Sequence, residues 1–212
     1  MFRDRVDAGS RLGAVLADLG LADPVILGIP RGGVIVAASV ARALRSPLDV
    51  LVTRKIGSPH NPELAIGALA PGVQVWDRDL LARLHVDRDY LRGAVASEEA
   101  ELARRTSTYR RARPPLDVAG RTVVIVDDGL ATGSTARAAV RWCRSAGAGH
   151  VLVAVPVAAP STLAMLAEEA DQVQAIDTPP SFHAVGEWYA DFTQTTDDEV
   201  VAALDSSGED HG

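Results

Sequence analysis

The fold is decided by one stretch of the sequence, VVIVDDGLATGST, at residues 123–135. Its first four residues are β-branched and predict a strand that is buried on both faces, as in a parallel sheet. Asp127 and Asp128 follow at the carboxyl end of that strand, where open α/β sheets place their ligands. A small, hydroxyl-rich turn then begins a helix, whose free amides and dipole favour a phosphate. The stretch therefore predicts an α/β protein with a phosphate site beside two carboxylates.

Apolar runs alternate with helical patterns over the rest of the chain, which is typical of α/β folds. We expect further strands at 24–28, 49–52, 151–155 and 172–176, and helices at 5–19, 32–44, 132–146 and 161–170. Residues 65–70 and 73–76 predict an antiparallel pair that turns at Pro71-Gly72. The predicted fold is a doubly wound, mainly parallel central sheet with helices on both faces and a small hood.

The organisation is interpreted as a single domain over residues 1–205, with a core at about 20–176. Residues 77–115 are polar, rich in both charges and helical in periodicity, and we expect a helical, mobile insertion there. The hood is placed at about 177–195. Small polar residues from 206 to 212 predict a disordered tail.

Composition bounds the class of protein. The 212 residues are 47% apolar and 23% charged with a formal net charge of −7, which suits a globular domain with a full core. This balance excludes a disulfide scaffold or a disordered chain and disfavours nucleic acid as a partner. The single cysteine, Cys143, cannot form an internal disulfide, and no apolar stretch reaches the ~20 residues of a membrane span. We expect a cytoplasmic protein without a membrane partner.

Two other segments carry cations beside strand ends. Residues 28–33, Gly-Ile-Pro-Arg-Gly-Gly, combine Arg31 with Gly32 and Gly33, which let backbone amides approach an anion closely. Residues 53–57, Thr-Arg-Lys-Ile-Gly, place Arg54 and Lys55 at the end of a strand. A plain turn and a solvated strand end remain alternatives for these two segments. We assign residues 61–67 no role beyond a rigid connection.

A phosphate at a helix start with two acids one turn away matches the shape of a ribose 5-phosphate. Here the chain resembles the type I phosphoribosyltransferases, whose motif for phosphoribosyl pyrophosphate (PRPP) has four apolar residues, two acids and a Thr-Gly-x-Thr loop. The adenine-specific version is the most similar. The resemblance implies that Asp127 and Asp128 hold the ribose hydroxyls. It implies that the 5-phosphate is held by Ala131, Thr132, Gly133, Ser134 and Thr135.

The same resemblance implies a pyrophosphate loop at residues 30–33, with a cis peptide between Pro30 and Arg31. Arg31, Gly32 and Gly33 would then hold pyrophosphate, and Lys55 would reach it as a catalytic residue. A basic cluster lies where the family carries a mobile loop over its site, and Arg110 is the predicted pyrophosphate contact. The cluster comprises Arg104, Arg105, Arg110, Arg111 and Arg113.

Four of the nine aromatic residues fall between Phe182 and Phe192. A small hydrophobic lid explains that clustering, but the stretch also resembles the hood of 6-oxopurine enzymes. That resemblance implies that Phe182 and His183 bind the base and that Asp191 approaches a metal. The loop has Ala131 where those enzymes carry an acid, and residues 151–181 contain no lysine. The acceptor base therefore stays unassigned.

The implied reaction is transfer of the 5-phosphoribosyl group from PRPP to a nucleobase-like acceptor, with release of pyrophosphate, as in nucleotide salvage. Mg²⁺ is the implied cofactor, bound mainly by PRPP oxygens and water. A homodimer is left open. Two alternatives remain: a PRPP- or nucleotide-binding regulator with little turnover, and a hydrolase of a phosphoribosyl compound.

Overall fold

A computed structural model describes residues 1–111 and 113–208. The predicted central strand is β6 (Thr122–Val126), in the middle of a five-stranded sheet of order β2-β1-β6-β7-β8. All of its pairings are parallel. The flanking strands are β1 (Val25–Gly28), β2 (Leu48–Val50), β7 (His150–Val157) and β8 (Gln172–Asp177).

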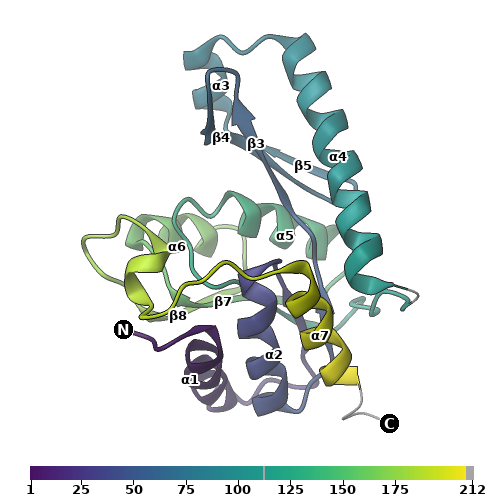
Figure 1. Cartoon of the computed structure of the whole chain (residues 1–212), viewed down its shortest axis with the longest axis vertical. Helices are drawn as coiled ribbons and strands as arrows, with labels where there is room; N and C mark the ends of the chain where they lie inside the picture. Colours follow the sequence, from purple (N-terminus) through teal and green to yellow (C-terminus); the bar gives the residue numbers. More distant parts are fainter. Residues whose placement is uncertain (112, 209–212) are drawn as a thin grey trace.

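Helices cover both faces of this sheet (Figure 1), as the sequence predicts. Alternate residues of β6 point to opposite sides, because side chains alternate along a strand. Val124 and Val126 pack against α1 (Arg5–Ala17) and α2 (Gly32–Leu44). Val123 and Ile125 pack on the other side, in the cluster that contains the apolar residues of α5 (Ser134–Ser145) and α6 (Pro160–Ala167). The predicted doubly wound α/β fold is confirmed.

A second unit projects from the sheet domain (Figure 1). It contains an antiparallel sheet of β3 (Arg54–Ser58), β4 (Asn61–Ala70) and β5 (Val73–Trp76), followed by α3 (Arg78–Leu84) and the long α4 (Arg88–Arg110). The antiparallel pair and the helical insertion agree with the sequence prediction. The interpretation of residues 61–67 as a connection is wrong, since they begin β4. Residues 54–64 lack an apolar run, so only pairing with neighbouring strands makes them a sheet.

The last third of the chain returns to both units. After β8, Phe2 pairs with Tyr189 in a single bridge beside a 3₁₀ turn at Val185–Trp188. Helix α7 (Asp197–Gly208) then buries Val201 and Leu204 in the core that α4 shares with β2. The structure extends α7 over residues 206–208 of the predicted tail, and residues 209–212 lie outside the described residues. Within the described ranges, no helix combines the length and apolarity that a membrane span requires.

Candidate active site

A cavity of about 350 Å³ opens at the carboxyl ends of β1 and β6. It brings together three segments that the sequence singled out for anion binding, together with two side chains from the stretch after β8. Its lining comprises residues 29–32, Thr53, Lys55, residues 127–133, Thr135, Val185 and Phe192. The parallel topology explains this meeting, because it places the carboxyl ends of neighbouring strands at one edge.

The loop after β6 is held by two backbone bonds at Leu130, in its middle. The Leu130 amide donates to the Val157 carbonyl (2.9 Å), and the Ala159 amide donates to the Leu130 carbonyl (3.0 Å). The Thr162 hydroxyl donates to the carbonyl of Ala131. Gly133 precedes α5 with a φ of +69°, and a Cβ there would lie 2.6 Å from the Thr162 methyl carbon. The loop is therefore fixed where the unpaired first amides of α5 begin.

Asp127 and Asp128 lie side by side at the floor of the cavity. Removal from water raises the pKa of both carboxyls, and the neighbouring Asp128 charge raises that of Asp127 further. The charge of Lys55, which lines the same cavity, acts in the opposite direction on both pKa values. The pair is thus a confined acidic site that a cation or a hydrogen-bond donor stabilises.

Arg5 contacts Asp128 from outside the cavity lining, and the sequence did not reveal this contact. Its Nε donates to Asp128 Oδ2 at 2.8 Å, and its guanidinium lies 4.0 Å from the centre of the Phe192 ring. The Tyr189 hydroxyl donates to the backbone carbonyl of Asp128 at 2.6 Å. Arg5 and Asp128 are 123 positions apart, so no local pattern links them.

The glycines of the predicted pyrophosphate loop allow close contact with the acids. The peptide between Pro30 and Arg31 is cis, as the resemblance implied. A Cβ on Gly32 would lie 2.0 Å from Asp128 Oδ2, and one on Gly33 would lie 2.8 Å from the Asp127 Cα. Any larger residue would separate this loop from β6.

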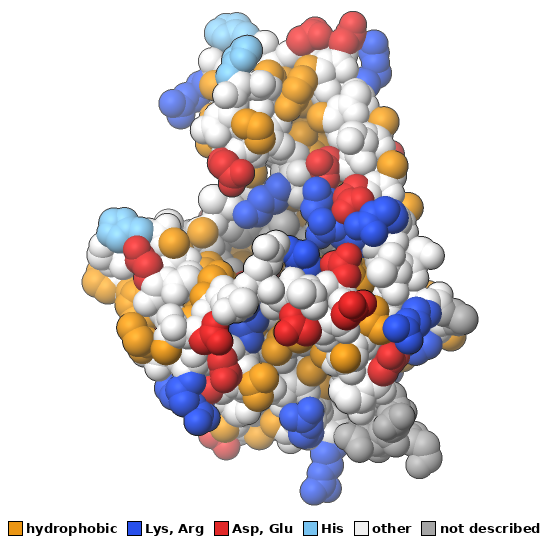
Figure 2. Space-filling view, viewed as in Figure 1, with side chains coloured by type: hydrophobic (Ala, Val, Ile, Leu, Met, Phe, Trp, Pro, Cys, Tyr) orange, Lys and Arg blue, Asp and Glu red, His pale blue; other side chains and the backbone are white. Residues whose placement is uncertain are grey.

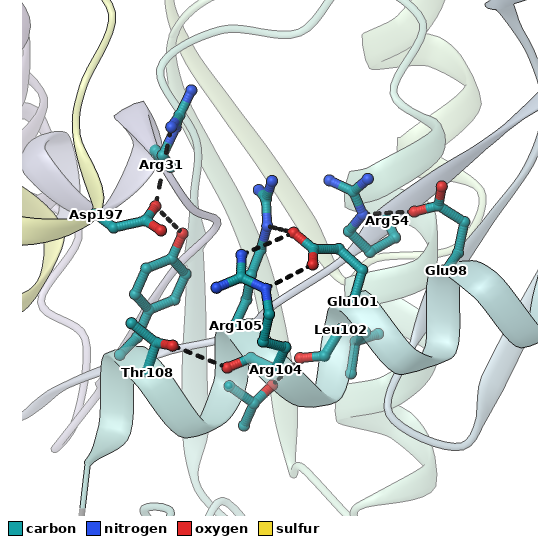
Figure 3. A network of polar contacts seen from close by, with 11 residues as sticks. Arg31, Arg54, Glu98, Glu101, Leu102, Arg104, Arg105, Thr108 and Asp197 are labelled. Atoms are coloured by element: carbon teal, nitrogen blue, oxygen red, sulfur yellow. Dashed lines mark hydrogen bonds and ion pairs between the residues drawn. The ribbon is translucent and has the colours of Figure 1, made fainter.

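Some of the cations near the cavity line it, and others pair with acids of the projecting unit. Arg31 lines the cavity and lies 3.8 Å from Asp197, which also accepts the Tyr109 hydroxyl at 2.7 Å (Figure 3). Lys55 faces the cavity, whereas Arg54 turns to Glu98 of α4 at 2.6 Å. Beside Lys55, the Thr53 hydroxyl is buried without a hydrogen-bond partner among the described residues. An unpaired donor at this position suits a polar ligand.

The structure does not bring Arg110 to this cavity. Arg110 ends α4 beside β2, where its guanidinium pairs with the buried carboxylate of Asp49 at 3.0 Å and lines a different cavity. Arg104 and Arg105 both pair with Glu101 (Figure 3). Figure 2 shows basic side chains gathered where the projecting unit meets the sheet domain, with acidic side chains among them. The basic cluster is therefore largely neutralised by its neighbours.

The predicted base and metal residues also lie outside the cavity lining. Phe182 packs in the apolar cluster of Phe2 and Tyr189, and the side chain of exposed His183 contacts the Ser181 hydroxyl. Asp191 accepts the Thr193 amide and hydroxyl and lines a neighbouring cavity. Phe192 takes the aromatic position at the site, ten residues beyond the predicted one. The aromatic clustering indicated the segment that contributes a ring to the cavity, but the sequence pattern did not predict which ring that is.

The fold and the site define an α/β protein with an acidic pair, a helix start and two cations around one cavity. The chain belongs to the phosphoribosyl transferase domain family, whose model matches residues 12–192. The predicted type I phosphoribosyltransferase resemblance is thereby confirmed.

Individual relatives agree with this membership. A Mycobacterium tuberculosis protein, provisionally named a phosphoribosyl transferase, is 47% identical over 99% of this chain and 48% of its own length. The chain thus spans about half the length of these curated relatives. The crystal structure of TT1426 from Thermus thermophilus is 45% identical, with a TM-score of 0.82 over 96% of this chain and 97% of that one. A Nocardioides uracil phosphoribosyltransferase is 38% identical over 41% of this chain and 38% of its own length.

Proposed function

We propose that the chain transfers the 5-phosphoribosyl group of PRPP to a nucleobase-like acceptor and releases pyrophosphate. One observation carries the proposal: a single cavity contains the acidic pair, the helix-start loop and two cations, Arg31 and Lys55. These are the groups that a sugar carrying phosphates at both ends requires. The proposal concerns this chain alone and makes no statement about the remaining half of the longer relatives.

Each part of PRPP has a matching set of groups. Residues 131–135 offer hydroxyls and the first amides of α5 to the 5-phosphate. Asp127 and Asp128, when ionised, accept hydrogen bonds from the ribose hydroxyls. Arg31, the amides of Gly32 and Gly33, and Lys55 lie on the pyrophosphate side. The unpartnered Thr53 hydroxyl beside Lys55 supplies a further donor.

Catalysis in this proposal rests on positioning and electrostatics. Departure of pyrophosphate leaves positive charge on the ribose ring, which a nearby carboxylate of the acidic pair stabilises. Lys55 and Arg31 stabilise the negative charge that develops on the leaving group. Holding ribose and acceptor in one cavity replaces a bimolecular encounter by a positioned one.

Magnesium enters this proposal with the substrate. No group of three or more His, Cys, Asp and Glu side chains suited to a metal occurs in the part of the chain that the structure describes. Mg²⁺ keeps much of its water and commonly bridges substrate phosphates, so PRPP oxygens and water are its proposed ligands. Bound in this way, it neutralises pyrophosphate charge. The cavity carboxylates and cations fit such a complex.

The acceptor is proposed to lie against Val185 and Phe192, the two apolar side chains that the stretch after β8 adds to the cavity lining. A flat heterocycle gains stacking and burial there. This placement replaces the predicted contacts at Phe182 and His183. The choice between purine and pyrimidine is left to experiment.

Calorimetry with PRPP and Mg²⁺, followed by product analysis with a panel of purines and pyrimidines, tests the proposal. We expect saturable PRPP binding and formation of a nucleoside monophosphate with at least one base. Binding without product from any base would favour a regulator, and pyrophosphate release without an acceptor would favour a hydrolase. Absence of PRPP binding would overturn the assignment.

A further inference from the structure

Asp128 lines the site cavity, and Arg5, which pairs with it, lines a second cavity. Asp128 shares the site cavity with Lys55 and the neighbouring Asp127. Arg5 reaches the carboxylate from α1 and lines a second cavity of about 390 Å³. The Asp128–Arg5 contact is therefore made from outside the proposed substrate cavity, and the guanidinium stays out of the substrate's way.

Arg5 is itself held in place by three contacts. Besides Asp128, its Nη1 donates to the Thr193 carbonyl at 2.8 Å, and its plane lies over the Phe192 ring. Its side chain is only 12% exposed. A guanidinium fixed on a carbonyl and a ring presents Nε in one direction, and that direction is toward Asp128 Oδ2.

The chain segment that carries Arg5 is anchored to the stretch that closes the site. The Phe2 amide donates to the Trp188 carbonyl (2.8 Å), the Ala190 amide to the Phe2 carbonyl (2.8 Å), and the Asp191 amide to the Arg3 carbonyl (2.9 Å). Asp4 caps α1 directly before Arg5. These bonds fix the backbone directly before Arg5, and Arg5 itself is the first residue of α1.

Gly32 provides the space for this pair. A Cβ at residue 32 would lie 2.0 Å from Asp128 Oδ2 and 2.4 Å from Arg5 Nε. The glycine that the sequence analysis assigned to anion contact therefore also accommodates the ion pair. Loop, acid and arginine form one packed arrangement.

From these contacts we propose that Arg5 is a positioning residue for the proposed transfer: it binds Oδ2 of Asp128 and so orients Oδ1 to accept a ribose hydroxyl. The inference rests on the proposed function and names a residue of the same site. The other charged or titratable groups facing Asp128 are Asp127, Lys55 and Tyr189. Arg5 is the one that contacts the carboxylate from α1.

The test compares two sugar phosphates by calorimetry at pH 8: ribose 5-phosphate and 2,3-dideoxyribose 5-phosphate, which lacks the 2- and 3-hydroxyls. We expect the unmodified protein to bind ribose 5-phosphate about tenfold or more tightly, because hydrogen bonds to charged acceptors are strong. In Arg5→Gln this ratio should fall close to one, while affinity for the dideoxy compound is unchanged. Arg5→Lys keeps the charge and should give an intermediate ratio.

Arg3→Gln is the matched control, since Arg3 pairs with Asp7 instead, is largely exposed and carries the same charge. It should keep the ratio of the unmodified protein. An Arg5→Gln protein that keeps the ratio, or weakens both ligands equally, overturns the inference. If that variant does not fold, Arg5→Lys decides: an unchanged ratio overturns the inference and a lowered one supports it. Failure of both ligands to bind the unmodified protein would instead contradict the proposed function.

Discussion

Arg5–Asp128 at the carboxyl end of β6 and Arg110–Asp49 on edge strand β2 are the same chemical pair in different surroundings. Both are largely buried and both are joined at 3.0 Å or less. Asp49 also accepts the amides of Leu116 (3.0 Å) and Val50 (2.7 Å), and Arg110 also donates to the Val50 carbonyl (3.0 Å). Asp128 instead lies beside a second confined carboxyl and borders an open cavity.

This difference separates a structural pair from one that faces a ligand. Arg110 and Asp49 have most of their hydrogen-bonding capacity filled by the protein, so a ligand has little to gain there. Asp127 and Asp128 can still accept hydrogen bonds from an incoming donor. Their pKa values are raised because burial destabilises the ionised carboxylates, and the protein compensates for this only in part. The two arginines are therefore distinguished by their partners: Asp128 can still accept a hydrogen bond from a ligand, whereas the hydrogen-bonding capacity of Asp49 is largely filled.

The largest expected effect is in the acidic pair itself. Asp127→Asn with Asp128→Asn should leave the fold intact and abolish detectable magnesium-dependent PRPP binding, a loss of about 100-fold or more. The amides keep the shape of the carboxyls but cannot accept hydrogen bonds with a full charge. Calorimetry measures the affinity, and circular dichroism checks the fold. Unchanged binding in the double variant would refute the site assignment.

A smaller effect is expected at the structural pair. Asp49→Asn leaves the Arg110 charge buried without its partner and should reduce the free energy of unfolding by about 3 kcal/mol. Urea unfolding measures this loss, and PRPP affinity of the folded variant should not change. Asp23→Asn is the control, because Asp23 pairs with Arg121 on the surface with its side chain 84% exposed; its loss should stay below about 1 kcal/mol. Weakened PRPP binding with full stability in Asp49→Asn would place Arg110 at the site after all.

The smallest effect is a pH dependence of stability that the acidic pair, Asp127 and Asp128, contributes. The pKa values of Asp127 and Asp128 are raised in the folded state above the ordinary 3.8, so the folded protein binds protons more tightly than the unfolded chain. Its free energy of unfolding should therefore fall as the pH rises from about 4 through the raised pKa values. The double Asn variant lacks this contribution. The difference in free energy of unfolding between this variant and the unmodified protein should grow with pH and then level off. Urea titrations from pH 4 to pH 9 measure this difference, and a constant value would mean that the pKa values of the two carboxyls are not shifted.

The prediction from sequence was most successful where the signal is local. The strand at 123–126, the acids after it and the helix start at Ser134 follow from one run of adjacent residues. The doubly wound sheet follows from the alternation of such runs. Hydrophobic periodicity also located the helical insertion now seen as α3 and α4. In each case neighbouring residues contain the information.

The prediction was least successful where a residue's partner is distant in sequence. Arg110 is one of several arginines at the end of α4, and it pairs with Asp49 only because the fold places it against β2. Phe182 and Phe192 belong to one aromatic stretch, and only the pairing of Phe2 with Tyr189 determines which ring reaches the cavity. Strand β3 has almost no apolar pattern and exists because β4 pairs with it.

The sequence alone therefore determined the fold class, the family resemblance, the acidic pair and the loop before α5. These features consist of adjacent residues, so the order of residue types is enough to predict them. Only the tertiary structure decided where each cation lies: Arg5 pairs with Asp128, Arg110 pairs with Asp49 away from the cavity, and Arg54 pairs with Glu98 while Lys55 lines the cavity. A charge acts on whatever lies within a few ångströms of it, and the folded topology, rather than the order of residues, sets that neighbourhood.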